Sequence, residues 1–519
     1  MADIVIINPR FEPSFWGMEH ALDLFGVKSS LPVASLPLLA ALTPAGHTVT
    51  LIDENVEEID WERCAKADIV GLTGMVVQRF RMREILSELK SRGCFVVVGG
   101  PWVTVKEDYF GNLADVIFIG EAETTWPQFL EEWAAGKHIQ RYEQAERTDM
   151  STVPVPRFDL LKMNEYSLAS VQFSRGCPFA CEFCDIIVTF GRRPRIKGAE
   201  QVIAELEALR ATGIDTAFIV DDNLIGNKKA IKVVLRRVAQ WQRDSGFPIA
   251  FLTEASLDLA DDGELMDLMV DCNIRTVFVG IETPNEESLR ETGKLQNLRG
   301  KVTLVDKVKA IQQRGMEVWS GMMLGFDHDD ATIFDRQIAF VEAADIVNCM
   351  VGMVSAIPKT PLYTRLNIAG RLDHDDRPKW GTNILPVGMS QETLRDGFLR
   401  VMRHLYDPKV YFDRLDRLYA DDFDGKQSAP RSKHMRRHPL RRLQMNAVLL
   451  AEAAVVFWRL TMTLGDKQLR KEYRRVLGKL LKRRPTPQLM QTYAVKSAMH
   501  YHTHKLIASM AGGGIVNSF

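Results

Sequence analysis

Three cysteines within eight consecutive residues constrain this chain more than any other feature of its sequence. Cys177, Cys181 and Cys184 follow the spacing C-x3-C-x2-C. Three thiolates at this spacing bind three irons of a cubane iron–sulfur cluster and leave the fourth iron without a protein ligand. An iron with an open coordination position is a site for chemistry. The sequence therefore predicts a catalytic iron–sulfur cluster.

A structural zinc and a disulfide are the alternatives for these three thiols. Structural zinc sites use four protein ligands, and no fourth Cys or His stands near the three. Disulfides suit small secreted chains, whereas this chain has 519 residues. The remaining cysteines are scattered singly, which is typical of buried thiols; they are Cys64, Cys94, Cys272 and Cys349.

Length and composition indicate a soluble protein of two or three domains, and an N-terminus without a signal peptide predicts that it is cytoplasmic. The net charge of -1 argues against a dedicated nucleic-acid binder. The N-terminus reaches Pro9 without the basic flank and long apolar run of a signal peptide. A membrane span needs ~20 uncharged apolar residues. The most apolar stretch, residues 447–460, is too short and contains Glu452 and Arg459.

Residues 1–150 contain short apolar runs rich in β-branched residues, separated by segments long enough for helices. Continuous apolar strands of this kind are covered on both faces, which predicts a doubly wound parallel sheet. The runs are residues 4–7, 48–52, 69–72, 95–98 and 116–119.

Glycines and polar residues follow these strands at corresponding positions. Doubly wound sheets bind ligands beyond the carboxyl ends of their strands, and glycines there let a backbone approach a bulky ligand closely. Any one of these glycines is explained by an ordinary turn. Their recurrence at the ends of several strands predicts a platform that binds a ligand. Its candidate residues are Thr73, Gly74, Gly99, Gly100, Pro101, Gly120, Glu121 and Glu123.

After a proline-containing linker at 151–164, residues 165–390 alternate between helical and strand patterns. Six βα units beginning at the cysteine loop predict a partial barrel, whose functional groups lie at the carboxyl ends of its strands. The later strands are predicted at 216–220, 248–252, 276–280, 317–324 and 350–356. A helix cap explains one polar residue there, but several predict a cofactor site; they include Asp222, Glu254, Ser256, Glu282 and Gly325.

This pattern resembles the radical SAM superfamily preceded by a cobalamin-binding domain. The strings at 172–179, 181–187, 221–228, 253–260 and 280–289 are similar to those of the hopanoid C-2 methyltransferase subgroup. The resemblance implies that the three cysteines hold a 4Fe-4S cluster and that S-adenosylmethionine chelates its fourth iron. It places Phe183 near the adenine, Glu254 and Ser256 at the methionine or ribose portion, and Glu282 and Gly325 along the nucleotide groove. The Asp-x-His-x-x-Gly motif is absent, so cobalamin is expected without a protein histidine on cobalt.

The same resemblance implies a cobalamin-dependent methyltransferase for an unactivated carbon of an apolar, hopanoid-like or other polycyclic small molecule. One S-adenosylmethionine recharges cobalamin with a methyl group, and a second supplies the 5′-deoxyadenosyl radical that activates the substrate. The electron donor is of the flavodoxin or ferredoxin type. Tyr363 and the strand at 350–353 are candidate substrate-pocket residues. Two alternatives stay open: radical chemistry other than methylation, and a non-catalytic cobalamin or cluster sensor.

Residues 391–519 are predicted to be helical, with basic stretches at 426–442, which we interpret as a hinge, and at 467–484. Such stretches are either solvated faces or attract anionic lipid headgroups. These basic stretches lack the interleaved aromatic residues on which nucleic-acid bases would stack, which argues against a nucleic-acid patch. Apolar residues alternate with the charges, as in a helix that lies at a membrane interface; they are Leu440, Leu443, Val448, Leu449 and Leu460. The sequence thus suggests peripheral contact with the inner face of the membrane.

Overall fold

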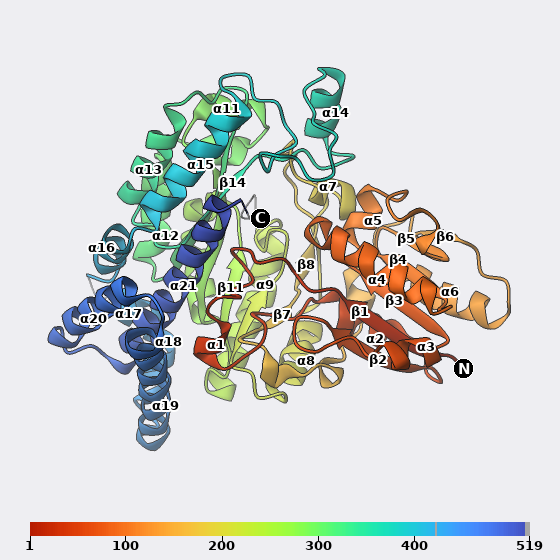
Figure 1. The fold of residues 1–519 in the computed structure, drawn as a ribbon. Coiled ribbons are helices and arrows are strands. Elements are labelled where there is room, and N and C mark those ends of the chain that lie inside the picture. Colours follow the sequence, from red (N-terminus) through yellow and green to blue (C-terminus); the bar gives the residue numbers. More distant parts are fainter. Residues whose placement is uncertain (421–422, 514–519) are drawn as a thin grey trace. The chain divides into compact units, whose positions relative to one another are not determined.

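A computed structural model describes residues 1–420 and 423–513 of the chain (Figure 1). They form two compact units, each built from separate stretches. Unit 1 comprises Met1–Glu12, Leu31–Arg237 and Ala356–Gly370, and unit 2 comprises Pro13–Ser30, Val238–Ser355 and Arg371–Phe519. The four segments expected from the sequence, 1–150, 151–164, 165–390 and 391–519, remain a prediction about domains.

A six-stranded, all-parallel sheet forms the first part of unit 1. Its order is β2-β1-β3-β4-β5-β6. The five predicted strands are confirmed, and the three-residue β6 was missed because only Tyr142 in it is buried. The strands are β1 (Asp3–Asn8), β2 (Thr48–Asp53), β3 (Ile69–Thr73), β4 (Val96–Gly99), β5 (Val116–Ile119) and β6 (Arg141–Glu143).

Helices cover both faces of this sheet, as a doubly wound fold requires. One apolar core lies under α3 (Trp61–Lys66), α4 (Arg79–Ser91) and α5 (Pro101–Val105). The other lies under α2 (Ser35–Leu42) and α6 (Thr125–Ala134). Because strand residues alternate between the two cores, the strands read as continuous apolar runs in the sequence.

The predicted linker contains no long helix or strand, and it packs within unit 1. Three short 3-10 turns occupy it and its flanks: Met150–Thr152, Phe158–Leu160 and Met163–Glu165. The Arg157 N–H donates to the Pro37 carbonyl of α2, and Phe158 is buried. The linker is therefore attached to the first sheet as well as preceding the next strand.

The strands predicted for the barrel are present and divide between the two units. Unit 1 holds β7 (Ala169–Val171), β8 (Ser174–Arg175), β9 (Arg195–Ile196), β10 (Thr216–Ile219) and the helices α7 (Ile186–Thr189), α8 (Ala199–Arg210) and α14 (Pro361–Ile368). Within unit 1, β7 pairs in parallel with β10. Strands β8 and β9 form an antiparallel pair, and the cysteine loop lies between them. Helix α9 (Lys228–Ser245) continues the chain.

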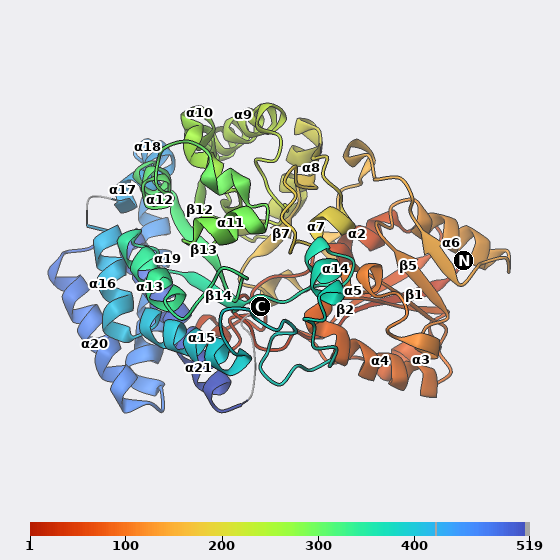
Figure 2. The ribbon, with the colours of Figure 1, turned by 90° about the horizontal axis from the view of Figure 1, so that it is seen from above.

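Unit 2 contains four successive parallel strands, each followed by a helix. They are β11 (Ala250–Glu254), β12 (Ile274–Glu282), β13 (Glu317–Leu324) and β14 (Cys349–Met353), with α10 (Gly263–Asp271), α11 (Glu286–Glu291), α12 (Leu304–Gln313) and α13 (Ile333–Ala343) (Figure 2). The predicted βα alternation is confirmed here. The four cysteines outside the cluster motif are buried, as expected.

The C-terminal part of unit 2 is helical, as predicted. Its central helix is α21 (Pro487–Ala511), whose buried Lys496 contacts Glu317 of β13 at 2.5 Å. The predicted hinge at 426–442 is wrong, because α17 (Phe423–Gln427), α18 (Ala429–Met435) and the start of α19 lie in it. The other helices are α15 (Gln391–Leu405), α16 (Pro408–Leu418), α19 (Pro439–Trp458) and α20 (Lys467–Lys482).

Helix α19 corrects the expectation about membrane spans. With the π-helical turn Arg459–Thr463 it extends over 25 residues, Pro439–Thr463, and is long and apolar enough to cross a membrane by length and composition. The apolar stretch 447–460 is shorter than the helix, because α19 begins eight residues before it, at Pro439. One such helix is weak evidence for a span.

Candidate active site

One pocket opens at the carboxyl ends of the strands of the first sheet. Its cavity volume is about 290 Å³, close to the lower end of the ~300–1,000 Å³ of pockets that take drug-sized ligands. The strand order changes direction between β1 and β3, and Asn8 and Thr73 from the ends of these strands both line the pocket. Doubly wound sheets bind their ligands at this topological position.

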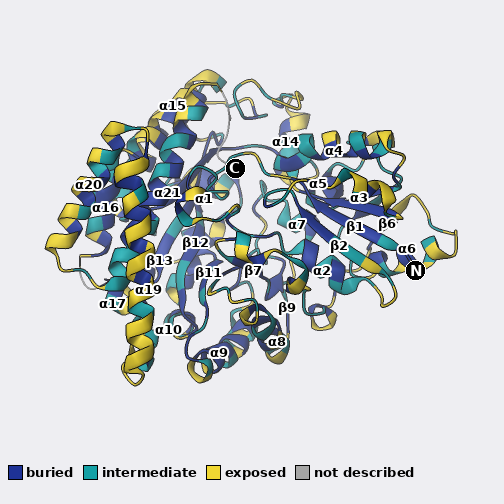
Figure 3. Ribbon diagram, turned by 60° about the horizontal axis from the view of Figure 1, so that its bottom comes forward, coloured by how far each residue is buried: buried dark blue, intermediate teal, exposed yellow. Residues whose placement is uncertain are grey.

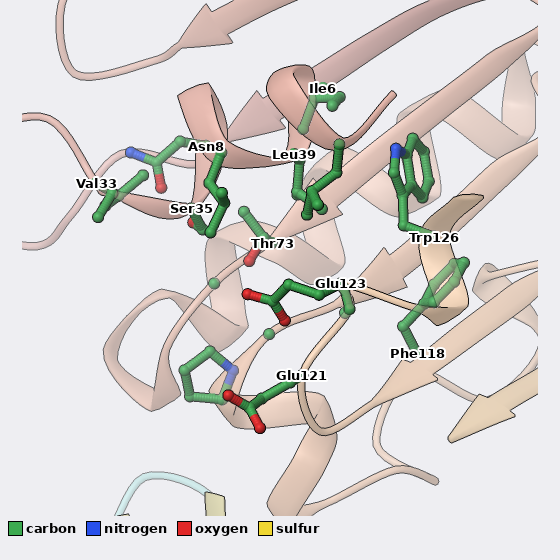
Figure 4. Close-up of a pocket in the computed structure, with 18 of the residues that line it drawn as sticks. Ile6, Asn8, Val33, Ser35, Leu39, Thr73, Phe118, Glu121, Glu123 and Trp126 are labelled. Atoms are coloured by element: carbon green, nitrogen blue, oxygen red, sulfur yellow. The ribbon is translucent and has the colours of Figure 1, made fainter. Parts of the chain in front are cut away.

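The structure brings together every residue predicted for the first ligand platform. Figure 4 shows Ile6, Leu39 and Trp126 on one side of the pocket and the carboxylates of the loop after β5 on the other. Gly100 has a φ of +97°, and a Cβ there would lie 2.7 Å from Thr73 Oγ1, so this turn requires glycine. The predicted residues that line the pocket are Thr73, Gly74, Gly99, Gly100, Pro101, Gly120, Glu121 and Glu123.

A buried ion network forms part of the pocket wall. The Arg175 guanidinium contacts Glu121 at 2.8 Å and Glu123 at 2.6 Å, and Arg195 contacts Glu121 at 2.9 Å. The four side chains are between 1% and 13% exposed. Burial raises the pKa of Glu121, but the hydrogen bonds from Arg175, the Thr148 N–H and Arg195, together with the Arg175 charge, outweigh it and hold that pKa below its usual range. The network joins the loop after β5 to β8, two residues before Cys177.

The base of the cysteine loop is held by the carboxylates that follow β10. Asp221 accepts hydrogen bonds from Phe173 N at 2.7 Å and Ser174 Oγ at 2.6 Å. Asp222 accepts from Gly176 N at 2.6 Å. Burial raises the pKa of Asp221 to about 7 and that of Asp222 to about 6. Both side chains are thus engaged in shaping the loop, which is a supporting role that the sequence did not indicate for Asp222.

Gly176 makes the sharp turn into the cysteine motif. Its φ is +89°, and a Cβ there would lie 2.9 Å from the Arg193 carbonyl oxygen. The Cys177 N–H donates to Gly191 O at 3.2 Å, and the Cys184 N–H donates to Cys181 O at 3.2 Å. These two backbone hydrogen bonds hold the first and the last cysteine of the motif in the loop.

Helix α14 packs against the cysteine loop within unit 1. The Arg365 guanidinium pairs with Glu182 at 2.5 Å, and the Leu362 N–H donates to Glu182 O at 2.9 Å. Tyr363, predicted as a substrate-pocket residue, lies on this helix and is half-buried. Phe183, between Glu182 and Cys184, is also half-buried.

The other predicted nucleotide-binding residues lie at strand ends in unit 2. Glu254 ends β11 and is half-buried, and Ser256 donates to Asp258 at 2.5 Å. Glu282 ends β12 and forms a buried ion pair with Lys294 at 2.6 Å.

The backbone is unusual at two of these positions. Glu282 has a φ of +68°, a left-handed conformation that a non-glycine residue holds only where its surroundings impose it, often at functional sites. At Gly325, φ is +102° and a Cβ would lie 2.8 Å from Leu394 Cδ2. The Gly325 N–H donates to Asp329 at 3.0 Å, so this turn is fixed by packing and by a hydrogen bond together.

Sequence comparisons place the chain among known enzymes. Residues 27–130 match the B12 binding domain, residues 171–335 match the radical SAM superfamily, and residues 360–513 match a domain of unknown function, DUF4070. The chain is 39% identical over 461 residues to an uncharacterized methyltransferase of Synechocystis sp., covering 88% of this chain and 83% of the relative. It is 34% identical over 420 residues to the hopanoid C-2 methylase of Rhodopseudomonas palustris, covering 80% of this chain and 78% of that protein.

The chain belongs to the cobalamin-dependent radical SAM methyltransferases. Its fold agrees with a solved structure of the cobalamin-dependent S-adenosylmethionine radical enzyme OxsB. The two share 14% identity with a TM-score of 0.62, and the match covers 99% of this chain and 81% of that one. The cofactors of this methyltransferase are a 4Fe-4S cluster, S-adenosylmethionine and cobalamin. The alternatives of non-methylating radical chemistry and of a non-catalytic sensor are set aside.

The pocket of unit 1 fits cobalamin. Its glycine turns present backbone to the ligand, and its apolar wall suits a bulky macrocycle. The residues that line it in the described part of the chain include no histidine. His47 lies at the start of β2, where its Nδ1 accepts from the Ala2 N–H. These residues fit a cobalamin that receives no imidazole from the protein.

The cysteine loop offers the donor set of an iron–sulfur cluster. Its three thiols, Cys177, Cys181 and Cys184, are free and lie on one short loop, and Cys thiolates are the ligands that hold such clusters. Among residues 1–420 and 423–513, no three His, Cys, Asp or Glu side chains are gathered as a site for one ion.

Several residues of the site were not found from the sequence. Arg175, Arg195 and Lys294 neutralise buried carboxylates. For Arg175, a signal existed: it stands directly before Gly176 in the motif-bearing stretch. Lys294 carries no such signal, because its partner Glu282 lies 12 residues away across a helix.

Proposed function

We propose that this methyltransferase acts on an unactivated carbon of a polycyclic, apolar small molecule, of hopanoid-like or other polycyclic type. The observation that carries the proposal is the 34% identity, over 78% of its length, to a hopanoid C-2 methylase. Cobalamin carries a methyl group, and the cluster with S-adenosylmethionine supplies the radical that activates a C–H bond.

An aromatic cluster in unit 2 supports an apolar substrate. Phe278 of β12 and Trp319 of β13 are direct neighbours across the sheet. The Trp16 ring lies 4.9 Å from that of Phe278 and 6.4 Å from that of Trp319. Phe15 and Met350 of β14 complete the cluster. A flat, polycyclic hydrocarbon would find matching surface here.

Two features leave this cluster available to a ligand. Trp16 and Trp319 are only half-buried, although aromatic side chains within a sheet core are usually covered. Position 321 in β13 is glycine, and a Cβ there would lie 3.0 Å from Phe278 Cζ. The glycine therefore preserves the position of the Phe278 ring. Met350 is 8% exposed and Met353 is fully buried, so of the two only Met350 belongs to this surface.

We assign the cofactor roles as follows. Cys177, Cys181 and Cys184 hold the cluster, and the eight strand-end residues of the unit 1 pocket hold cobalamin. Glu254, Ser256, Glu282, Gly325 and Phe183 serve the S-adenosylmethionine, with the Lys294 ion pair fixing the Glu282 carboxylate and Asp222 supporting the loop. An electron donor of the flavodoxin or ferredoxin type reduces the cluster. We place the enzyme in the cytoplasm, in peripheral contact with the inner face of the membrane, where an apolar substrate partitions.

The substrate proposal is tested by comparing lipid and pigment extracts of a strain that lacks the gene with those of the parent. We expect one or more polycyclic lipids to lose exactly one methylene unit in mass, and expression of the gene to restore it. A mass difference confined to polar metabolites would contradict the proposal.

The chemistry is tested with purified, reconstituted enzyme. Replacing Cys177, Cys181 and Cys184 by Ala should abolish the visible absorption of the cluster and the formation of 5′-deoxyadenosine, while cobalamin binding persists because the pocket residues are separate. Trp319→Ala should raise the KM for substrate and leave substrate-independent cleavage of S-adenosylmethionine unchanged. Loss of cobalamin from the cysteine variant would refute the separation of the two sites.

A further inference from the structure

Helix α19 exposes a continuous apolar stripe. Its members are three to seven residues apart along the helix, at spacings that place them on one side of it. At ~1.5 Å per residue, the stripe extends over ~33 Å. Figure 3 shows much of α19 coloured as exposed. The most exposed members are Leu440 at 83%, Leu443 at 68%, Val448 at 50%, Val455 at 47%, Trp458 at 58% and, in the following turn, Met462 at 56%.

The opposite side of α19 is part of the core of unit 2. Leu449, Ala453, Val456 and Phe457 are buried, and α19 packs along α21. Leu449 and Leu460, which the sequence suggested for a membrane-facing side, are therefore on the protein-facing side. Because one side is already packed on the protein, α19 cannot cross a bilayer without giving up this core. The exposed stripe alone is available for an external partner.

Arginines surround the first turn of the helix. Arg436, Arg437, Arg441 and Arg442 are all exposed, and none has an acidic partner among the residues that the structure describes. Arg441 and Arg442 lie in the first turn of α19, where cations oppose the helix dipole, so helix stability does not explain their position. Arg436 and Arg437 directly follow the C-terminus of α18, which a cation stabilises. The single acidic residue of α19, Glu452, is bonded to Gln491 at 2.7 Å.

We propose that this side of α19 docks on the surface of an anionic lipid bilayer. The apolar stripe would enter the boundary between headgroups and acyl chains, and the four arginines would contact lipid phosphates. An apolar stripe with a basic cluster and no free carboxylate is the pattern of helices that lie in a membrane interface. The charge favours this occupant over a second copy of the chain, because lipid phosphates neutralise the arginines, whereas the only acidic residue of α19, Glu452, is bonded to Gln491. The inference does not depend on which polycyclic molecule is methylated.

The test uses the full-length, reconstituted enzyme in a flotation assay. Vesicles of phosphatidylcholine with 30% phosphatidylglycerol, ~30% being a strongly anionic surface, are compared with vesicles of phosphatidylcholine alone. We expect the enzyme to float with the anionic vesicles and to be released by high salt, since surface charges are screened. Brominated acyl chains should quench a fluorescence component that is missing in Trp458→Phe.

Two sets of variants separate the contributions. Leu443→Gln with Val448→Gln should weaken binding about ten-fold or more, because exposed apolar residues lose their burial in lipid. Arg436→Gln with Arg437→Gln should weaken it roughly five-fold per charge and flatten the salt dependence. Val233→Gln, on α9 and 57% exposed, is the matched control and should bind like the parent.

The outcomes distinguish this occupant from others. Equal binding to both vesicle types, or unchanged binding of both variant pairs, would overturn the proposal. A dimer in light scattering that Leu443→Gln converts to a monomer would assign the face to a second copy instead. Enzyme released only by detergent would show insertion rather than docking. Retained 5′-deoxyadenosine formation in every variant would show that weakened binding is not a loss of fold or of the cluster.

Discussion

Removing Arg175 should reveal how strongly the ion network holds the cobalamin pocket to the cysteine loop. In Arg175→Met the side-chain volume is nearly kept, but Glu123 loses its only ion partner among the described residues and Glu121 keeps Arg195. Breaking a buried pair costs ~3–5 kcal/mol because a charge stays buried and uncompensated. Since Arg195 still pairs with Glu121, we expect the free energy of unfolding to fall by about 3 kcal/mol, the lower end of that range.

A double variant tests whether the unpaired Glu123 carboxylate causes the loss of stability. Glu123→Gln in the Arg175→Met background removes the uncompensated carboxylate, so the double variant should be more stable than Arg175→Met by about 1–2 kcal/mol. Urea unfolding followed by fluorescence gives the free energy of unfolding for the parent, both single variants and the double variant. Additive losses, or a loss below about 1 kcal/mol in Arg175→Met, would refute the reasoning.

The same variants also report on function. Arg175 stands two residues before Cys177, so a loosened network should lower the iron retained after gel filtration and the cobalamin retained in the same sample. Arg175→Lys keeps the charge but loses the planar fork, and we expect an intermediate result. Full retention of both cofactors in Arg175→Met would show that the network serves stability alone.

Three further predictions concern single positions. Gly100→Ala should weaken cobalamin binding and cost about 1–3 kcal/mol, because its φ of +97° and the nearby threonine hydroxyl exclude a Cβ; Gly93→Ala, with φ of +75° and open space around it, is the matched control outside the pocket. Lys294→Met should leave the Glu282 carboxylate buried without its cation, lower the free energy of unfolding by about 3 kcal/mol and raise the KM for S-adenosylmethionine. Burial lowers the pKa of His502 from 6.5 to about 4, so the folded state resists its protonation. Stability is therefore full above the unfolded-state pKa of about 6.5 and falls as the pH drops toward 4, by about 2 kcal/mol at pH 5; His502→Gln should remove that part of the slope in urea titrations.

Each of these has a result that contradicts it. Equal cobalamin affinity in Gly100→Ala and Gly93→Ala would mean that the turn tolerates a side chain. An unchanged KM in Lys294→Met would remove Glu282 from the nucleotide site. A pH slope that survives His502→Gln, but disappears in a variant of the buried His500, would assign the acid sensitivity to the other imidazole.

Features with a local sequence pattern could be predicted. Features that depend on contacts between residues far apart in the chain could not. The strands of both sheets could be read because covered strands are continuous apolar runs. The pocket residues could be found because parallel strands bring their carboxyl ends to one edge. In contrast, the side of α19 that faces the protein was assigned incorrectly for Leu449 and Leu460, since an amphipathic pattern cannot tell which apolar stripe packs on α21. Arg175 and Lys294 escaped notice because their carboxylate partners are brought close only by the fold.

The division of the chain between the two units has a consequence for how the protein is made. The chain passes from one unit to the other at five points, the first after residue 12 and the last after residue 370. During synthesis, unit 1 is complete only after Ala356–Gly370 has emerged, more than two hundred residues after the last strand of the first sheet. Truncation after the B12-binding segment would leave Pro13–Ser30 without the rest of unit 2, on which it packs. Excising either half by a single cut is therefore expected to yield aggregation rather than an isolated, folded domain.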